Sequence, residues 1–324
     1  MPGSVTAPYR PAAITIRAIG NGRSVSEEAP GLRRLDGGLR MAFLPAAPVM
    51  SALKNMRVRC GCLDGLDFLW LEITSRCNLT CTHCYANSGP DLPLSERMTF
   101  TDWCRVIDEA RGAGCRRLQF IGGEPTIHPD LEKLLEHATR VGFRRCEVFT
   151  NATILREDLI RRFKTLGVLV HFSFYSFDPA VHDQITGQNG SFERTVEGIR
   201  QLARRRVRMA AGIILLPQNA ANLSQTKKFL RRLGVNSIGI DRVRGVGRGQ
   251  QFVPRAAAPR GELCGECWSG KLCVDSNGDV HPCVFSRFVS VGNVLDDGIA
   301  TIVAGARLRA FRHDMFLGNQ GEWQ

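Results

Sequence analysis

The chain has 324 residues, of which 44% are hydrophobic, and a formal net charge of +12. This length and apolar content suffice for a real core, in one large domain and a smaller one. No apolar run approaches the ~18 residues that a membrane helix needs, and no signal peptide is recognisable, so we expect a cytoplasmic protein without a membrane partner.

The first fifty-odd residues are rich in Pro, Gly, Ala and Arg and contain few acids. They resemble a transit peptide weakly. The interpretation that we prefer for residues 1–55 is a disordered leader or a misassigned start codon, with Met41, Met50 or Met56 as the true start.

From residue 67 onward, short apolar runs alternate with helical patterns. Strands are predicted over 67–74, 116–122, 144–151, 167–176, 207–217 and 235–243. Helices are predicted over 99–113, 128–142, 156–166, 191–205 and 223–233, with Thr99 as an N-cap. This alternation predicts an α/β fold with a parallel sheet and outer helices. Six units are too few for an eight-unit barrel, so we expect a partial (β/α)6 TIM-like barrel as the core domain, residues 56–245.

The last part of the chain, residues 246–324, has a different pattern. The Gly-, Arg- and Pro-rich segment 244–262 reads as a linker. Residues 272–285 contain Asn-Gly between two short apolar runs, which predicts a β-hairpin. A helix is expected over about 298–312. We therefore predict a small cysteine-rich C-terminal module after the barrel.

The chain contains twelve cysteines, and without a secretion signal these argue for metal or redox chemistry rather than a disulfide framework. Nine fall into three groups: Cys60 and Cys62; Cys77, Cys81 and Cys84; and Cys264, Cys267, Cys273 and Cys283. The other three, Cys104, Cys115 and Cys146, stand alone in apolar patterns and are predicted to be small core residues.

Cys77, Cys81 and Cys84 follow the first predicted strand, and loops after strands form the reactive face of β/α barrels. Three convergent thiolates can hold three irons of a cubane cluster and leave the fourth iron open for an exchangeable ligand. The alternative is a zinc site completed by His83 or by a distant residue.

The second predicted strand ends in "IGGEPT", residues 121–126. Gly122 and Gly123 permit close approach of a ligand to the backbone, and Glu124 can accept hydrogen bonds from an ammonium group. Pro125 favours an extended Glu124. Because this motif lies one unit after the cysteine loop, both are expected on the same face.

The C-x3-C-x2-C loop and the Gly-Gly-Glu-Pro motif together resemble radical S-adenosylmethionine (SAM) enzymes, over roughly residues 64–245. The resemblance implies that Cys77, Cys81 and Cys84 hold a [4Fe–4S] cluster whose open iron binds SAM. Reductive cleavage of SAM then releases a 5′-deoxyadenosyl radical that abstracts a hydrogen atom from substrate. It also implies an external electron donor such as a flavodoxin or ferredoxin.

The same resemblance suggests the remaining contacts with SAM. Gly122, Gly123 and Glu124 would bind its methionine end. Hydroxyl groups at strand ends, Ser173 foremost, would meet the ribose; the other strand-end candidates are Thr150, Asn151 and Ser176. His83 stands where the family usually has an aromatic residue near adenine, and residues 212–219 stand where other adenine contacts are expected.

Cys264, Cys267, Cys273 and Cys283 could hold zinc or an auxiliary [4Fe–4S] cluster. The sequence "VDSNGDVHPC" resembles the entry to the auxiliary-cluster extensions of radical SAM enzymes that are called SPASM and twitch. No cysteine follows Cys283, which favours a single auxiliary cluster.

We therefore predict a radical SAM enzyme, of oxidoreductase type, that oxidises or cross-links a ribosomal peptide or a related natural product. One alternative is an epimerase or dehydrogenase of a small molecule such as a sugar, with Cys60 or Cys62 as hydrogen-atom donor. A second is a non-catalytic iron–sulfur or zinc protein. Arg242 and Arg244 could bind a substrate carboxylate or phosphate. No nucleic-acid motif accompanies the basic charge, which makes nucleic acid the least favoured partner.

Overall fold

The computed structural model describes residues 65–92, 97–253 and 259–318. The predicted leader, the alternative start codons and the pair Cys60 and Cys62 lie outside these residues. Of the helices in the described ranges, none is long and apolar enough to cross a membrane.

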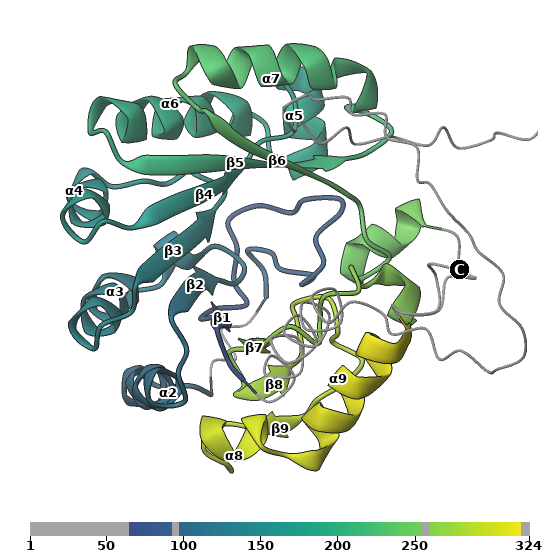
Figure 1. Ribbon diagram of the computed structural model, residues 1–324. Coiled ribbons are helices and arrows are strands. Elements are labelled where there is room, and N and C mark those ends of the chain that lie inside the picture. The colour runs from purple at the N-terminus through teal and green to yellow at the C-terminus, as the bar shows by residue number, and fades with distance from the viewer. Residues whose placement is uncertain (1–64, 93–96, 254–258, 319–324) are drawn as a thin grey trace, which may run out of the picture. The chain divides into compact units, whose positions relative to one another are not determined.

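One sheet carries the strands in the order β6-β5-β4-β3-β2-β1-β7-β8-β9. The first six strands pair in parallel: β1 Phe68–Glu72, β2 Arg117–Ile121, β3 Arg145–Thr150, β4 Leu169–Ser173, β5 Arg208–Leu215 and β6 Ser237–Arg242. Figure 1 shows that they form a curved wall with helices outside it. The prediction of a partial (β/α)6 barrel is confirmed.

The outer layer consists of α2 Phe100–Gly112, α3 Leu131–Arg140, α4 Glu157–Thr165, α6 Ser191–Arg204 and α7 Leu223–Arg232. Helix α2 begins as predicted, because Thr99 and Asp102 form a capping box in which each side chain bonds the backbone of the other. The sequence did not predict α5, Pro179–Thr186, which starts at an Asp178 cap and ends at Gly187 with φ 69°.

Alternation along each strand separates the core from the barrel interior. On β1, Leu69 and Leu71 are fully buried in the main core beneath α2, with Trp103. On β4, Val170 and Phe172 are fully buried on the helix side. The intervening side chains point to the concave face, so the inward positions of the strands are free to carry polar residues. Cys115 and Cys146 are buried in the core and Cys104 packs against it, as predicted.

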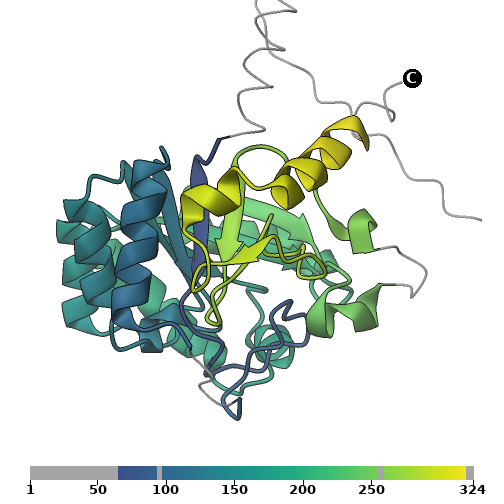
Figure 2. The same cartoon turned by 90° about the horizontal axis from the view of Figure 1, so that it is seen from below.

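The C-terminal strands extend the same sheet. Strand β7, Lys271–Val274, pairs in parallel with β1, and β8, Asp279–His281, returns antiparallel through the predicted Asn277–Gly278 turn. The short edge strand β9, Gly292–Asn293, pairs antiparallel with β8. Figure 2 shows these strands and the yellow helices beside the blue β1. The sequence could not give this pairing, because β7 and β1 are far apart in the chain.

Two predicted boundaries were wrong in this region. The single helix expected over 298–312 is two helices, α8 Ile299–Val303 and α9 Ala306–Gly318, separated at Ala304 and Gly305. The segment 244–262 is not a free linker: it contains the 3₁₀ helices Gly247–Phe252 and Pro259–Glu262, and the first of them packs against the loop after β1.

Candidate active site

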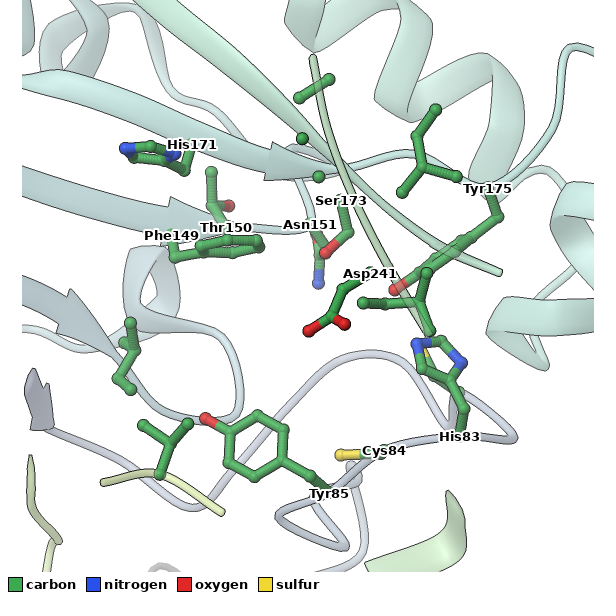
Figure 3. A pocket seen from close by; sticks show the side chains of 18 of the residues that line it. His83, Cys84, Tyr85, Phe149, Thr150, Asn151, His171, Ser173, Tyr175 and Asp241 are labelled. Carbon is green, nitrogen blue, oxygen red and sulfur yellow. The ribbon is translucent and has the colours of Figure 1, made fainter. Parts of the chain in front are cut away.

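A cavity of about 540 Å³ lies on the concave face of the sheet. Its walls come from the loop after β1, from β1 to β6 and their carboxyl ends, and from Val284 and Phe285. This volume is within the ~300–1,000 Å³ that is usual for cofactor sites. Figure 3 shows His171 and Phe149 toward one end of the cavity and Cys84 with His83 toward the other.

The cysteine loop, residues 75–89, carries Cys77, Cys81 and Cys84 and follows β1 directly. It is paired with the end of α5: Thr80 N donates to Thr186 O at 3.1 Å, and Thr82 N donates to Ile185 O at 2.9 Å. Helix α5 therefore positions the loop over the cavity.

Arg248, in the first 3₁₀ helix after β6, holds the same loop from the other side. Its Nε donates to Cys81 O and its Nη2 to Ser88 O, both at 2.7 Å, while its backbone N–H donates to Cys84 O at 2.9 Å. The conformation of the cysteine loop thus depends on a residue from the segment that we had predicted to be a linker.

Replacing Arg248 by Ala should loosen the cysteine loop. Hydrogen bonds from a charged donor contribute about 1.5–3 kcal/mol each, so we expect the free energy of unfolding to fall by roughly 3 kcal/mol in urea denaturation, with faster loss of iron to a chelator. Arg248→Lys keeps the charge but not the two-nitrogen fork and should be intermediate. A variant as stable as the parent would contradict this anchoring role.

The thiols of the cysteine loop share a low-dielectric environment. Burial, followed by the nearby Glu124, raises the pKa of Cys77 to about 12, and burial, followed by Cys77 and Cys84, also raises the pKa of Cys81. Protonated thiols do not bind metal, so these side chains need a cationic partner to become ligands. Within the described ranges, no three His, Cys, Asp or Glu side chains are arranged to hold a single metal ion. Three thiols around one cavity fit a cluster that takes one sulfur per iron.

The glycines of the Gly-Gly-Glu-Pro motif serve the packing of the cysteine loop. A Cβ on Gly122 would lie 2.3 Å from Thr74 O, and one on Gly123 would lie 2.1 Å from Arg76 O. Gly123 N donates to Thr74 O at 2.7 Å and Glu124 N to Arg76 O at 2.9 Å. Both glycines line the cavity, but it is the loop backbone that excludes a side chain at either position.

Glu124 is fully buried, and its carboxylate joins the ends of β2 and β3. Its Oε1 accepts hydrogen bonds from Thr126 N, Thr126 Oγ1 and Thr150 Oγ1 at 2.6–3.0 Å, and Oε2 accepts one from Asn151 N at 2.7 Å. Burial raises the pKa of Glu124 despite these donors. Its predicted contact with SAM stays a prediction, and its structural role was not foreseen.

Three of the other four strand-end candidates line the cavity and one does not. Ser173, Thr150 and Asn151 line the cavity. Ser176 is fully buried and its Oγ accepts from Asp178 N at 3.0 Å, so it supports the start of α5 instead.

His83 lies in the cavity wall against Tyr175, with ring centroids 4.8 Å apart and planes at 73°. Burial lowers the pKa of His83 to about 4, and its Nδ1 has no hydrogen-bond partner among the described residues. In the segment 212–219, Gly212, Ile213 and Ile214 line the cavity, whereas Asn219 is buried and bonds the backbone around it.

A row of inward side chains that the sequence analysis missed crosses β1 to β4. Trp70 Nε1 donates to Gln119 Oε1 at 3.0 Å, Gln119 Nε2 donates to Glu147 Oε2 at 2.8 Å, and His171 Nε2 lies 3.0 Å from the same oxygen. Burial alone would raise the pKa of Glu147, but His171 and Gln119 outweigh it and hold this pKa below its usual value. The sequence does contain a signal for this row, because polar residues stand at inward-facing, alternate positions of otherwise apolar strands.

Arg242 and Arg244 line the cavity, but acids from the chain already pair with them. Arg242 Nη1 lies 3.2 Å from Glu262 Oε2, and Arg244 Nη2 lies 2.8 Å from both Asp241 oxygens. Their predicted role toward a substrate anion stays a prediction.

Cys264, Cys267 and Cys283 lie together beside the hairpin. The Sγ atoms of Cys267 and Cys283 are 3.3 Å apart, and Cys267 also bonds Cys264. Hydrogen bonds from Cys267 lower the pKa of Cys264 to about 5 and that of Cys283 to about 7, and they raise its own. Two thiols with lowered pKa values beside a third fit a cluster that takes one sulfur per iron.

Cys273 approaches this group from β7. In the β7–β8 pairing, the residue opposite Cys273 is His281 and not Cys283. Cys273 is buried on the concave side of the sheet, where it pairs with Trp70 of β1. Burial, followed by the Glu72 carboxylate, raises the pKa of Cys273 well above its usual value.

Comparison with known families decides the class of this molecule. Residues 71–230 match the family model of the radical SAM superfamily, and residues 264–322 match that of an iron–sulfur cluster-binding domain. The chain belongs to the radical SAM superfamily. Membership implies that this radical SAM enzyme uses SAM, the [4Fe–4S] cluster that binds it and auxiliary iron–sulfur, which confirms the predicted family and cofactors.

The curated relatives have different products. AlbA, the antilisterial bacteriocin subtilosin biosynthesis protein of Bacillus subtilis (strain 168), is 25% identical over 263 residues, which cover 71% of this chain and 58% of AlbA. The AdoMet-dependent heme synthase of Methanosarcina barkeri (strain Fusaro / DSM 804) is 28% identical over 181 residues, 56% of this chain and 51% of the synthase. The chain therefore spans about half the length of these relatives.

A solved structure confirms the fold. Streptococcus suis SuiB bound to S-adenosylmethionine superimposes with a TM-score of 0.66 over 84% of this chain and 75% of SuiB, at 15% identity. SuiB has also been solved bound to its precursor peptide SuiA.

Proposed function

We propose that this radical SAM enzyme oxidises or cross-links a ribosomal peptide or a related natural product. One observation carries the proposal: a single cavity is lined by Cys77, Cys81 and Cys84 and also by Val284 and Phe285, which directly follow Cys283. A substrate in this cavity would lie between the site that starts radical chemistry and a site that can take up an electron.

In this proposal Cys77, Cys81 and Cys84 hold the SAM-binding cluster, which when bound supplies the electron that cleaves SAM to a 5′-deoxyadenosyl radical. Gly122 and Gly123 line the cavity beside the cysteine loop and would offer backbone to the methionine end, and Ser173, which also lines the cavity, would meet the ribose. Tyr175 and the neutral His83 pack against each other in the cavity wall at this end.

Glu124 is proposed to bind the SAM ammonium through Oε2, which accepts only one hydrogen bond from the described residues. The negative charge is what the ammonium needs, so Glu124→Gln should weaken SAM binding about tenfold or more, since a hydrogen bond to a charged group contributes about 1.5–3 kcal/mol. Isothermal titration under anaerobic conditions measures this.

The matched control for Glu124→Gln is Thr126→Val. It removes a donor to Glu124 Oε1 without changing the charge, and should leave SAM affinity nearly unchanged. Unaltered affinity in folded, iron-loaded Glu124→Gln would remove Glu124 from the cofactor site.

Cys264, Cys267, Cys273 and Cys283 are the proposed ligands of the auxiliary cluster. Zinc is the alternative at this site, and iron analysis together with the visible spectrum of the reconstituted protein separates the two. The proposal places the enzyme in the cytoplasm, where a flavodoxin or ferredoxin could reduce it.

Bacteriocin biosynthesis by AlbA and the precursor peptide of SuiB support a peptide substrate. A small molecule is the second candidate, supported by the match to a heme synthase. Anaerobic incubation of the reduced enzyme with SAM and candidate peptides, porphyrins or sugars, followed by mass spectrometry, decides between them. A peptide that loses two hydrogen atoms supports the proposal, whereas turnover of the small molecules alone contradicts it.

A further inference from the structure

Three side chains, Glu72, Tyr85 and Arg287, form a bridge between the two cysteine sites. Tyr85 Oη donates to Glu72 Oε1 at 3.0 Å, and Arg287 Nη2 donates to Glu72 Oε2. The Arg287 guanidinium also lies over the Tyr85 ring, 5.3 Å from its centroid. We call these three residues the Glu72 bridge.

The Glu72 bridge reaches both sets of thiols. Tyr85 follows Cys84 directly, and its ring contacts Phe285, near Cys283, with centroids 5.3 Å apart. Glu72 lies two residues after Trp70 on the same face of β1, and Trp70 pairs directly with Cys273 of β7. Glu72, with Arg287 bound to it, therefore lies diagonally across the sheet from this buried thiol. The Glu72 bridge therefore lies where its charges are felt by a cluster bound at Cys273.

Glu72 of the Glu72 bridge is buried, and Arg287 is half-buried. The Glu72 side chain is 6% exposed and that of Arg287 is 28% exposed. Burial disfavours the charged guanidinium, but the Glu72 carboxylate outweighs burial and raises the pKa of Arg287. Arg287 Nε is buried without a hydrogen-bond partner in the described part of the chain. Charges in such surroundings act over longer distances than exposed ones.

We propose that the Glu72 bridge sets the reduction potential of the auxiliary cluster, with Arg287 raising it and Glu72 lowering it. A positive charge stabilises the more negative, reduced form of a cluster, and a negative charge destabilises it. The inference rests on the proposed function, because it requires an auxiliary iron–sulfur cluster at Cys273.

The electron that this potential governs comes from the substrate. After hydrogen abstraction, the carbon-centred substrate radical loses one electron and, to water, one proton. An oxidised auxiliary cluster held by Cys264, Cys267, Cys273 and Cys283 would accept that electron. In this proposal Arg287 makes the electron transfer more favourable by raising the reduction potential of the cluster. It does not touch the substrate and is therefore not a catalytic residue.

The test is a redox titration of the auxiliary cluster, followed by electron paramagnetic resonance. It uses the full chain carrying Cys77→Ala, Cys81→Ala and Cys84→Ala, so that only this cluster contributes. Arg287→Met should lower the ratio of reduced to oxidised cluster at least tenfold at a fixed ambient potential, a shift of about 59 mV for one electron. Glu72→Gln, which is isosteric, should shift the potential in the opposite direction.

Two further variants serve as controls. Arg287→Lys keeps the charge and should retain most of the parent potential. Arg162, which pairs with Glu132 and Glu136 between α3 and α4, is the matched arginine remote from the cysteines, and Arg162→Met should leave the potential unchanged.

The outcomes separate the inference from the function on which it rests. Opposite shifts for Arg287→Met and Glu72→Gln support the inference. Unchanged potentials, or shifts of the same sign, overturn it and leave the proposed function intact. Reconstituted protein that carries no auxiliary cluster overturns both.

Discussion

Replacing Cys77, Cys81 and Cys84 together by Ala is expected to halve the iron content of the reconstituted protein. The parent should carry about eight irons in two cubane clusters, and the triple variant about four. Cleavage of SAM to 5′-deoxyadenosine should fall to background, because the remaining cluster would have no open iron. Iron analysis and chromatography of the reaction products measure the two effects.

Cys104→Ala is the matched control for the triple variant. Cys104 packs at the edge of the core and belongs to neither cysteine site, so its removal should leave iron and SAM cleavage unchanged. A triple variant that kept its full iron content would show that the cysteine loop is not a cluster site.

Removing the auxiliary site should separate cofactor cleavage from product formation. In Cys267→Ala with Cys273→Ala, the first site is intact, so SAM should still be cleaved. The substrate radical, however, loses its electron acceptor, and the oxidised product should be absent by mass spectrometry. Loss of these ligands could also unfold the C-terminal strands, which circular dichroism of the variant tests.

The opposite result has a definite meaning. A folded variant that made product at the normal rate would assign the auxiliary site a structural role only. A mechanism that returns a hydrogen atom through Cys60 or Cys62 would then be preferred to the proposed oxidation.

The sequence alone determined the class of chemistry. The spacing of Cys77, Cys81 and Cys84 after an apolar strand, and Gly122–Gly123–Glu124 after the next, are local patterns, and carboxyl ends of parallel strands meet at one edge. The six strands and the Thr99 cap were predictable for the same reason: short apolar runs and capping residues act within a few positions.

Tertiary structure alone decided how the two cysteine sites are joined. The pairing of β7 with β1 places Cys273 beside Trp70, and Arg248 reaches Cys81 from a segment that reads as a linker. The Glu72 bridge likewise depends on contacts between distant parts of the chain. Such contacts arise from the burial of apolar faces and the pairing of buried charges, and neither leaves a pattern in the sequence near the residues concerned.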